Sequence, residues 1–330
     1  MTWITKVPNA VSGNKWLNRV VMGVHRRTAS RSLVCFFVPQ KSKGWILEAA
    51  CREIAQRLDV PYIFSGDHKA LPKALAYFFC HYHFYLSALK FNPWLKQENC
   101  VVWFTHPKEP DLGGNQTIDA LQHATVVTMS STWKRYLVEL GLQEDRVTTV
   151  VGAADPQFFP YHERGGGKVG FCTAYYERKH PDRILETVRQ LPEYQFVLMG
   201  RNWQDYPRFA ELTRLNNLEY REAQYRDYPT FYAELDVFVS ASQLEGGPIP
   251  LLESMMSNVV PVASDTGFAP DVINHGENGY LFPADEQDSS RIAQLVTQAM
   301  QLRTDVRQTV LPYSWDAYAE KHVRLFKAAA

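Results

Sequence analysis

Short apolar runs alternate with helix-like segments from end to end, and this alternation constrains the fold more than any other feature. The runs that read as buried strands are residues 33–38, 101–104, 124–129, 147–151, 169–172, 196–199, 237–240 and 259–263. The helical stretches between them are residues 44–58, 132–140, 181–190 and 230–234. Strands that are apolar throughout and separated by helices are typical of parallel sheets covered on both faces. We therefore predict an α/β fold with doubly wound sheets.

Length and composition fit two globular domains. The chain has 330 residues, of which 45% are hydrophobic and 13% aromatic, so it has the apolar material for a full core and disorder is not expected. Lysine plus arginine and aspartate plus glutamate number 35 each, so no overall charge favours nucleic acid as a partner. Three consecutive glycines at residues 165–167, flanked by charges, mark the expected linker between the domains.

The five cysteines are scattered, at positions 35, 51, 80, 100 and 172, with no C-x-x-C pair. An odd number without metal-ligand spacing favours reduced thiols over a disulfide scaffold or a zinc site. The sequence shows neither a signal-peptide pattern nor a run of 18 apolar residues. We therefore expect a cytoplasmic protein that does not span a membrane.

The segment most specific for function is E-G-G-P-I-P-L-L-E, from Glu245 to Glu253. It follows an apolar strand and precedes a short helix. Gly246 and Gly247 permit a tight turn and close approach of a ligand to the backbone. Pro248 suits the first position of a helix, because the N–H that it lacks would be unpaired there. The segment therefore predicts a strand-loop-helix junction that binds a ligand.

The start of this helix offers backbone donors to an anion. Pro248 and Pro250 have no N–H, which leaves the amides of Gly247, Ile249 and Leu251 as the expected free donors. Free N–H groups at a helix N-terminus, with the helix dipole behind them, favour a phosphate. The sequence therefore predicts a phosphate group at this point.

The two glutamates of the segment suit a sugar better than a phosphate. Glu245 is predicted to act on sugar hydroxyls or on a developing positive charge, and Glu253 to accept hydrogen bonds from a ribose diol. The ordinary alternative is that Glu245 complements the helix N-terminus and that Glu253 is a solvated helix residue. The neighbouring glycines, prolines and apolar strands favour the ligand-binding interpretation.

Residues 240–283, SASQLEGGPIPLLESMMSNVVPVASDTGFAPDVINHGENGYLFP, resemble retaining GT-B glycosyltransferases, specifically family 4 (glycosyl transferases group 1). The resemblance lies in the E-G-x-G/P-x-x-x-x-E pattern, the P-V-x-A/S-S-D that follows it, and the closing N-G-x-L-F. Three further segments are similar to the family in the same order: VTTVVGAADPQFFP (147–160), KVGFCTAYYERKHPDRIL (168–185) and the Ser-Trp pair at 314–315. The resemblance covers about residues 120–325 and is weak over the first hundred residues.

The resemblance implies a GT-B fold of two Rossmann-like, doubly wound domains that face each other across a cleft. Residues 1–150 would form the acceptor-binding domain and 151–310 the nucleotide-sugar-binding domain, and 311–330 a helix that packs back on the first. The implied activity is transfer of a hexosyl or related group, with retention, from a nucleotide-diphosphate sugar to a glycan or lipid-linked acceptor of a bacterial surface polysaccharide such as lipopolysaccharide or capsule. Alternatives are a non-catalytic GT-B subunit that supports a partner enzyme, and a nucleotide-sugar epimerase on the same fold.

The resemblance also assigns roles to residues. Glu245, Lys179 and His106 are the expected catalytic residues. The expected donor-binding residues are Arg178, Lys179, Gly200, Arg201, Glu245, Gly246, Gly247, Pro248, Ile249 and Glu253. No metal or cofactor is expected, because no D-x-D lies in a suitable loop and a basic pair can stabilise the leaving diphosphate. For His106, which follows an apolar strand, a hydrogen-bonded structural histidine is an equal alternative.

One position departs from the family pattern. The family normally has an arginine about five residues before the lysine that corresponds to Lys179, and this chain has Ala174 there. Either Arg178 or Arg201 would replace it, or the correspondence with the family is shifted by one residue. A solvated pair of loop charges is the ordinary interpretation of Arg178 and Lys179 taken alone.

The first hundred residues carry two further features. The segment 73–91, KALAYFFCHYHFYLSALKF, is predicted to be helical, either as a core helix or as an aromatic surface that contacts a membrane or a lipid-linked acceptor. The N-terminal region is locally basic, which favours either attraction to anionic head groups at the inner face of the cytoplasmic membrane or, equally, ordinary solvated faces. Its cations are Arg19, Arg26, Arg27, Arg31, Lys41 and Lys43. A glycine loop near the acceptor, Ser12 to Lys15, is weighed against an ordinary turn.

Overall fold

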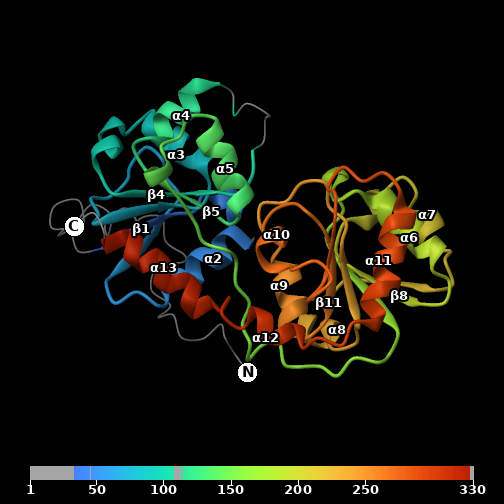
Figure 1. The fold of residues 1–330 in the computed structure, drawn as a ribbon. Coiled ribbons are helices and arrows are strands. Elements are labelled where there is room, and N and C mark those ends of the chain that lie inside the picture. The colour runs from blue at the N-terminus through green and yellow to red at the C-terminus, as the bar shows by residue number, and fades with distance from the viewer. Residues whose placement is uncertain (1–32, 45, 108–111, 113, 328–330) are drawn as a thin grey trace. The chain divides into compact units, whose positions relative to one another are not determined.

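The computed structural model describes residues 33–44, 46–107, 112 and 114–327. They divide into two compact units, one that runs to Val102 and includes Val323 onward, and one from Trp103 to His322. Figure 1 follows the chain through these elements. No described helix has the length and apolar character needed to cross a membrane.

The first sheet has six strands in the order β2-β1-β3-β4-β5-β6. Its strands are β1 (Val34–Phe37), β2 (Tyr62–Ser65), β3 (Ala76–Phe79), β4 (Cys100–Phe104), β5 (Thr125–Thr128) and β6 (Val147–Thr149). The pairs β1–β2, β1–β3, β3–β4 and β5–β6 are parallel. The α-helices between them are α2 (Ile46–Ala55), α3 (Tyr82–Leu89), α4 (Asn115–Leu121) and α5 (Ser131–Glu139).

The second sheet has the order β12-β11-β10-β7-β8-β9, and all its pairs are parallel. Its strands are β7 (Lys168–Cys172), β8 (Gln195–Met199), β9 (Leu218–Arg221), β10 (Val237–Ser240), β11 (Val260–Ser264) and β12 (Tyr280–Phe282). The α-helices that follow β7 in the chain are α6 (Pro181–Gln190), α7 (Phe209–Leu212), α8 (Tyr228–Tyr232), α9 (Ile249–Met256), α10 (Ala269–Val272), α11 (Ser289–Gln301), α12 (Val306–Val310) and α13 (Trp315–Lys327).

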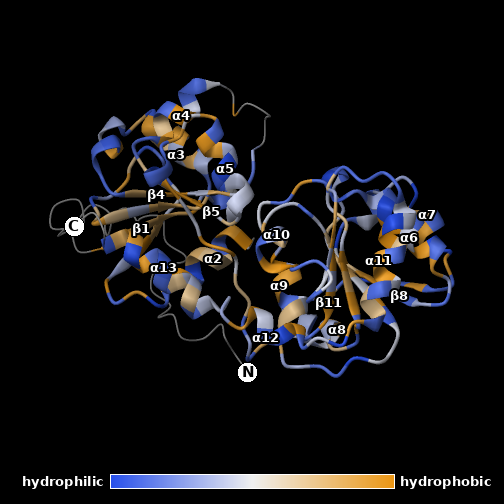
Figure 2. Cartoon of the chain, in the orientation of Figure 1, coloured by the Kyte–Doolittle hydropathy of each residue, from blue (hydrophilic) through white to orange (hydrophobic). Residues whose placement is uncertain are grey.

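Helices cover both faces of the second sheet. Figure 1 shows α6 and α11 on one face and α9 on the other. Figure 2 shows hydrophobic residues concentrated in β11 and β8 and over nearly all of α9. Seven of the eight residues of α9 are buried, including Glu253. The helix that follows the glycine-proline junction is therefore a core helix that places a carboxyl group in the interior.

Each of the eight predicted strands is present, with ends within one or two residues of the prediction. Four strands were not predicted: β2, β3, β9 and β12. The prediction of one helix over residues 73–91 is wrong for its first half, because Ala76–Phe79 is strand β3 and only Tyr82–Leu89 is helical. All four residues of β3 are buried, and continuous burial removes the periodicity that distinguishes a strand from a helix. The core interpretation holds for β3 and for three residues of α3.

Several sequence features lie at the edges of what the structure describes. Ser12 to Lys15 and the arginines at positions 19, 26, 27 and 31 lie outside the described residues, as does the side chain of Lys41. At the other end, the ring of Phe326 in α13 lies 6.0 Å from that of Phe36 and 6.1 Å from that of Phe78. The domain limits at residues 150 and 310 stay a prediction.

The three-glycine segment is held by one buried carboxylate. The amides of Gly165, Gly167 and Lys168 all donate to the side chain of Asp236, the first two to different oxygens. Asp236 lies directly before β10 and is 5% exposed. The expected linker is therefore fixed to the start of the strand that leads to Glu245.

Candidate active site

The predicted strand-loop-helix junction lies at the carboxyl end of β10, next to the carboxyl end of β7. The two strands pair in parallel, so the loops that follow them start from the same edge of the sheet. Ligands of open parallel sheets bind at this edge. The loop after β7 carries Arg178 and Lys179, and the loop after β10 carries Glu245. The fold thus brings together two segments 66 residues apart in the sequence.

Glu245 is the centre of this arrangement. Its side chain is 8% exposed and accepts hydrogen bonds from Lys179 Nζ, from Ser242 Oγ at 2.7 Å and from Arg178 Nη1 at 3.4 Å. Burial alone would raise the pKa of this carboxyl, but the charges of Lys179 and Arg178 and the hydrogen bonds hold the pKa below its ordinary value. Glu245 is therefore an ionised carboxylate in a buried ion pair.

Arg178 connects the two loops. Its Nη1 donates to the carbonyl of Leu244 at 2.8 Å, and its own carbonyl accepts from the amide of Gln243 at 2.8 Å. The guanidinium also lies 5.7 Å from the centre of the Tyr176 ring. The side chain is 38% exposed, so part of its donor fork faces solvent. Of the two arginines proposed to replace the one missing at Ala174, Arg178 is the one that contacts Glu245.

The space at this junction is narrow. A cavity of about 30 Å³ is lined by Lys179, Glu245, Pro248, Pro250 and residues at the ends of β7 and β10. Pockets for ligands of drug size are typically about 300–1,000 Å³. The enclosed space between these residues is therefore smaller than a ligand of that size.

The prediction that the amides of Ile249 and Leu251 are free is wrong. Ile249 N donates to Gly247 O at 2.9 Å, and Leu251 N donates to Pro248 O at 2.8 Å. Pro248, with φ −74° and ψ 83°, is the centre of an inverse γ-turn that precedes α9 and serves as its N-cap, not as its first residue. Of the three predicted donors, the amide of Gly247 has no acceptor among the described residues.

The two glycines of the junction are needed for close packing against the chain itself. A Cβ on Gly246 would lie 2.5 Å from the carbonyl oxygen of Thr105, and one on Gly247 would lie 2.8 Å from the sulfur of Met129. The backbone of Thr105 therefore contacts the glycine turn, and His106 is the next residue in the chain. His106 Nδ1 lies 3.0 Å from the carbonyl oxygen of Pro107.

Glu253 is buried, with an exposed fraction of 1%, and is paired with two tyrosines. Tyr225 Oη donates to Oε1 at 2.9 Å, and Tyr232 Oη donates to Oε2 at 2.9 Å. Burial raises the pKa of Glu253 to about 7, and the two tyrosine hydroxyls only partly offset it. The alternative of a solvated helix residue is wrong. Nothing in the sequence singled out Tyr225 and Tyr232, which lie 28 and 21 residues before Glu253.

The remaining residues predicted to bind the sugar donor, Gly200 and Arg201, directly follow β8. Gly200 has φ +157°, and a Cβ there would lie 1.9 Å from the carbonyl oxygen of Thr173 in the loop after β7. Its amide donates to Arg221 O, and its carbonyl accepts from Tyr220 Oη at 3.0 Å. The carbonyl of Arg201 accepts from Tyr175 N at 3.0 Å. Arg201 thus joins the loop after β7 to the end of β8, while Gly200 is hydrogen-bonded to β9 and packs closely against the loop after β7.

Across the described stretches of the chain, no group of three or more histidine, cysteine, aspartate or glutamate side chains is placed to hold a metal ion. The metal-independent reaction stays a prediction.

Comparison with known proteins assigns the class. Residues 159–320, just under half of the chain, match the model of the family described as Glycosyl transferases group 1. No curated protein sequence is similar enough to this chain to match it. Residues 159–320 are therefore similar to a group 1 glycosyltransferase domain.

Three solved structures show the same fold at low sequence identity. HepE of Anabaena, in complex with UDP and glucose, has a TM-score of 0.72 and 13% identity over 90% of this chain and 100% of its own. Sucrose-phosphate synthase from Thermosynechococcus elongatus has a TM-score of 0.72 and 14% identity, over 90% of this chain and 99% of its own. The lipopolysaccharide outer core galactosyltransferase WaaB, in its apo form, has a TM-score of 0.69 and 12% identity, over 90% and 100%.

The predicted GT-B fold of two Rossmann-like domains is thereby confirmed. The fold and the domain match define an enzyme of the glycosyltransferase class. The residues that match the family model include Arg178, Lys179, Glu245 and Glu253.

Proposed function

We propose that the protein is a retaining glycosyltransferase that moves a sugar from a nucleotide-diphosphate sugar to a glycan or lipid-linked acceptor. The observation that carries this proposal is the contact of the buried Glu245 carboxylate, in the loop before α9, with Lys179 and with the partly exposed Arg178. A surface polysaccharide of bacteria is the proposed acceptor system, and the similar fold of a lipopolysaccharide galactosyltransferase is consistent with it.

The proposed chemistry follows from charge. Departure of a nucleoside diphosphate builds negative charge on its β-phosphate, and fixed donors stabilise that charge best. The donors at the junction are Lys179, the exposed part of the Arg178 guanidinium and the amide of Gly247. When the diphosphate takes Lys179, Glu245 loses its closest partner and can accept from hydroxyls of the transferred sugar. His106, beside the glycine turn, is proposed to line the donor–acceptor side.

Donor binding is the direct test. Thermal shifts of the purified protein would be measured with UDP-, GDP- and TDP-sugars, and the anomeric configuration of any product by NMR. We expect one nucleotide series to raise the melting temperature and the product to retain the configuration of the donor. No shift with any nucleotide would favour a non-catalytic GT-B subunit. Isomerisation of the donor sugar without transfer would favour an epimerase.

We propose that the predicted contact with a membrane is made by the surface around Phe91 and Trp94, and not by the whole of residues 73–91. Phe91 is 51% exposed and Trp94 is 36% exposed, in a unit where most other aromatic side chains are buried. Lys69 Nζ lies 5.3 Å from the centre of the Phe91 ring, and Lys90 and Lys96 flank the two aromatic residues in the sequence. Exposed aromatic rings beside lysines suit the head-group region of an anionic membrane.

Vesicle sedimentation tests this surface. We expect the protein to sediment with vesicles that contain phosphatidylglycerol and not with pure phosphatidylcholine, with binding that weakens as salt increases. The double variant K69Q/K96Q should lose about 2 kcal/mol of binding, since each lysine contributes about 1 kcal/mol at such a surface. R291Q, on α11, is the control. Equal losses in both proteins would contradict this surface.

A further inference from the structure

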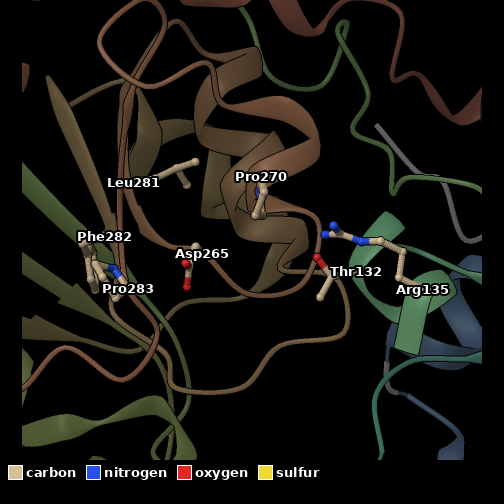
Figure 3. A pocket seen from close by; sticks show the side chains of 7 residues that line it. All are labelled: Thr132, Arg135, Asp265, Pro270, Leu281, Phe282 and Pro283. Carbon is tan, nitrogen blue, oxygen red and sulfur yellow. The ribbon is translucent and has the colours of Figure 1, made fainter. Parts of the chain in front are cut away.

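A second, larger pocket lies beside the junction and is shown in Figure 3. Its volume is about 490 Å³, and its open mouth faces solvent. The lining side chains come from α5, from the loop after β11, from α10, and from β12 and the residue that follows it. They are Thr132, Arg135, Asp265, Pro270, Leu281, Phe282 and Pro283. Nothing in the proposed donor site uses these residues.

Hydrogen bonds within the unit fix the position of α5 beside this pocket. They join the start of the helix to two loops of the second sheet and to α10: Ser130 Oγ donates to Gly267 O at 2.6 Å, Trp133 Nε1 to Glu245 O at 2.8 Å, and Ser131 N to Asp271 Oδ2 of α10 at 3.0 Å. Thr132 and Arg135 lie one helical turn apart on α5, so they share a face. Figure 3 shows both on the opposite side of Pro270 from Asp265. The pocket is therefore built by secondary structure that several contacts hold in place.

The polar groups of the pocket are available to a ligand. Within the described part of the chain, the guanidinium of Arg135 has no ion pair or hydrogen bond. The hydroxyl of Thr132 also makes no hydrogen bond there. Asp265 Oδ1 accepts a hydrogen bond from the amide of Ala284 at 2.7 Å, so Oδ2 is the oxygen available to a ligand. Leu281, Pro270 and Pro283 supply apolar surface between these groups. One end of the pocket thus carries a cation and the other a carboxylate.

The pocket adjoins Glu245. Thr266, the residue after Asp265, accepts a hydrogen bond through Oγ1 from the amide of Glu245 at 3.1 Å. A Cβ on Gly267 would lie 2.9 Å from the Cβ of Glu245, so the Asp265 loop packs directly against this residue. A molecule in the pocket would therefore lie next to the position proposed for the transferred sugar.

We propose that this pocket is an acceptor subsite for a sugar that carries a negatively charged group. The proposal rests on the proposed transferase function for its position next to the donor. Hydroxyls of the sugar would donate to Asp265 Oδ2 and Thr132, and its C–H face would pack on Leu281 and the prolines. The charged group would bind the fork of Arg135, which suits both phosphate and carboxylate.

The test uses simple sugars as probes with the full-length protein. Saturation-transfer NMR titrations would compare glucose, glucose 6-phosphate, glucuronate and inorganic phosphate. We expect both anionic sugars to bind more tightly than glucose and than phosphate alone. R135Q should weaken both anionic sugars about tenfold, the cost of one hydrogen bond to a charged group, and leave glucose unchanged. Loss of glucose 6-phosphate binding alone would identify the charged group as a phosphate.

A neighbouring cation provides the matched control. Lys134 lies on the same helix and pairs with Glu144 at 3.2 Å, outside the pocket, so K134Q removes the same charge without touching the site. Equal weakening in R135Q and K134Q would overturn the proposal, as would glucose binding as tightly as its anionic relatives. Titration with UDP separates this site from the donor site. Binding of anionic sugars through Arg135 without any binding of UDP would support the pocket and contradict the proposed donor.

Discussion

Replacement of Lys179 by methionine is expected to lower turnover on the order of 10²–10³-fold, the effect of removing one fixed donor from a developing anion. The same change should lower the free energy of unfolding by about 3 kcal/mol, because it leaves the buried carboxylate of Glu245 without its closest cation. Turnover would be followed as release of nucleoside diphosphate, and stability by urea denaturation.

A double variant separates the two effects. In K179M/E245Q no buried charge is left unpaired, and the side-chain amide that replaces the carboxylate of Glu245 can still accept a hydrogen bond from Ser242. We expect most of the lost stability to return while turnover stays low. Recovery of turnover together with stability would contradict the catalytic roles proposed for both Lys179 and Glu245. R189Q, which removes a cation of exposed ion pairs, is the control for loss of positive charge.

Glu253 is expected to control both donor affinity and the pH dependence of stability. Its pKa is raised to about 7, so in the folded protein its neutral form is favoured. The stabilising contribution of this proton is complete below the unfolded pKa of about 4.5 and is lost as the pH rises through 7. Relative to E253Q, the wild type should therefore lose about 2–3 kcal/mol of unfolding free energy between pH 5 and pH 8. Parallel pH dependences in urea denaturation would contradict the raised pKa.

The tyrosines that donate to Glu253 are expected to affect the affinity for the nucleotide. If this carboxyl holds the ribose, a tyrosine hydroxyl must leave it first. Tyr232 is fully buried and cannot leave, whereas Tyr225 is 52% exposed. We therefore expect Y225F to bind UDP several-fold more tightly in calorimetry and E253Q to bind it at least about tenfold more weakly. Y228F, which alters a neighbouring hydroxyl, should leave the affinity unchanged. Weaker UDP binding in Y225F would show that this hydroxyl contacts the nucleotide.

The sequence predicted the strands that are buried on both faces and missed those at the edges. Of the four unpredicted strands, β2, β9 and β12 lie at edges of their sheets. An edge strand is short and partly exposed, so it lacks the continuous apolar run that marks an interior strand, as LEYR in β9 shows. The fourth, β3, is apolar but merges with the aromatic start of α3. Burial therefore determined which elements could be recognised.

For the candidate site, sequence analysis predicted residues that the structure brings together, but not all of their partners. Glu245, Arg178 and Lys179 were predicted as two halves of one site, and the structure places them in contact. The tyrosines on Glu253 could not be found, because a tyrosine in an apolar segment looks like any core residue. The backbone amides of Ile249 and Leu251 were predicted to be free, because the sequence does not indicate the γ-turn at Pro248.

The contact of Asp236 with the glycine segment bears on how the protein moves. Three consecutive glycines have the greatest conformational freedom that a backbone offers, and fixing each residue costs about 1–2 kcal/mol of entropy. Here one carboxylate already holds two of those amides. The glycine composition of residues 165–167 suggests a hinge, but the hydrogen bonds to Asp236 restrain this segment. We therefore expect any hinge motion of the chain to occur outside these residues.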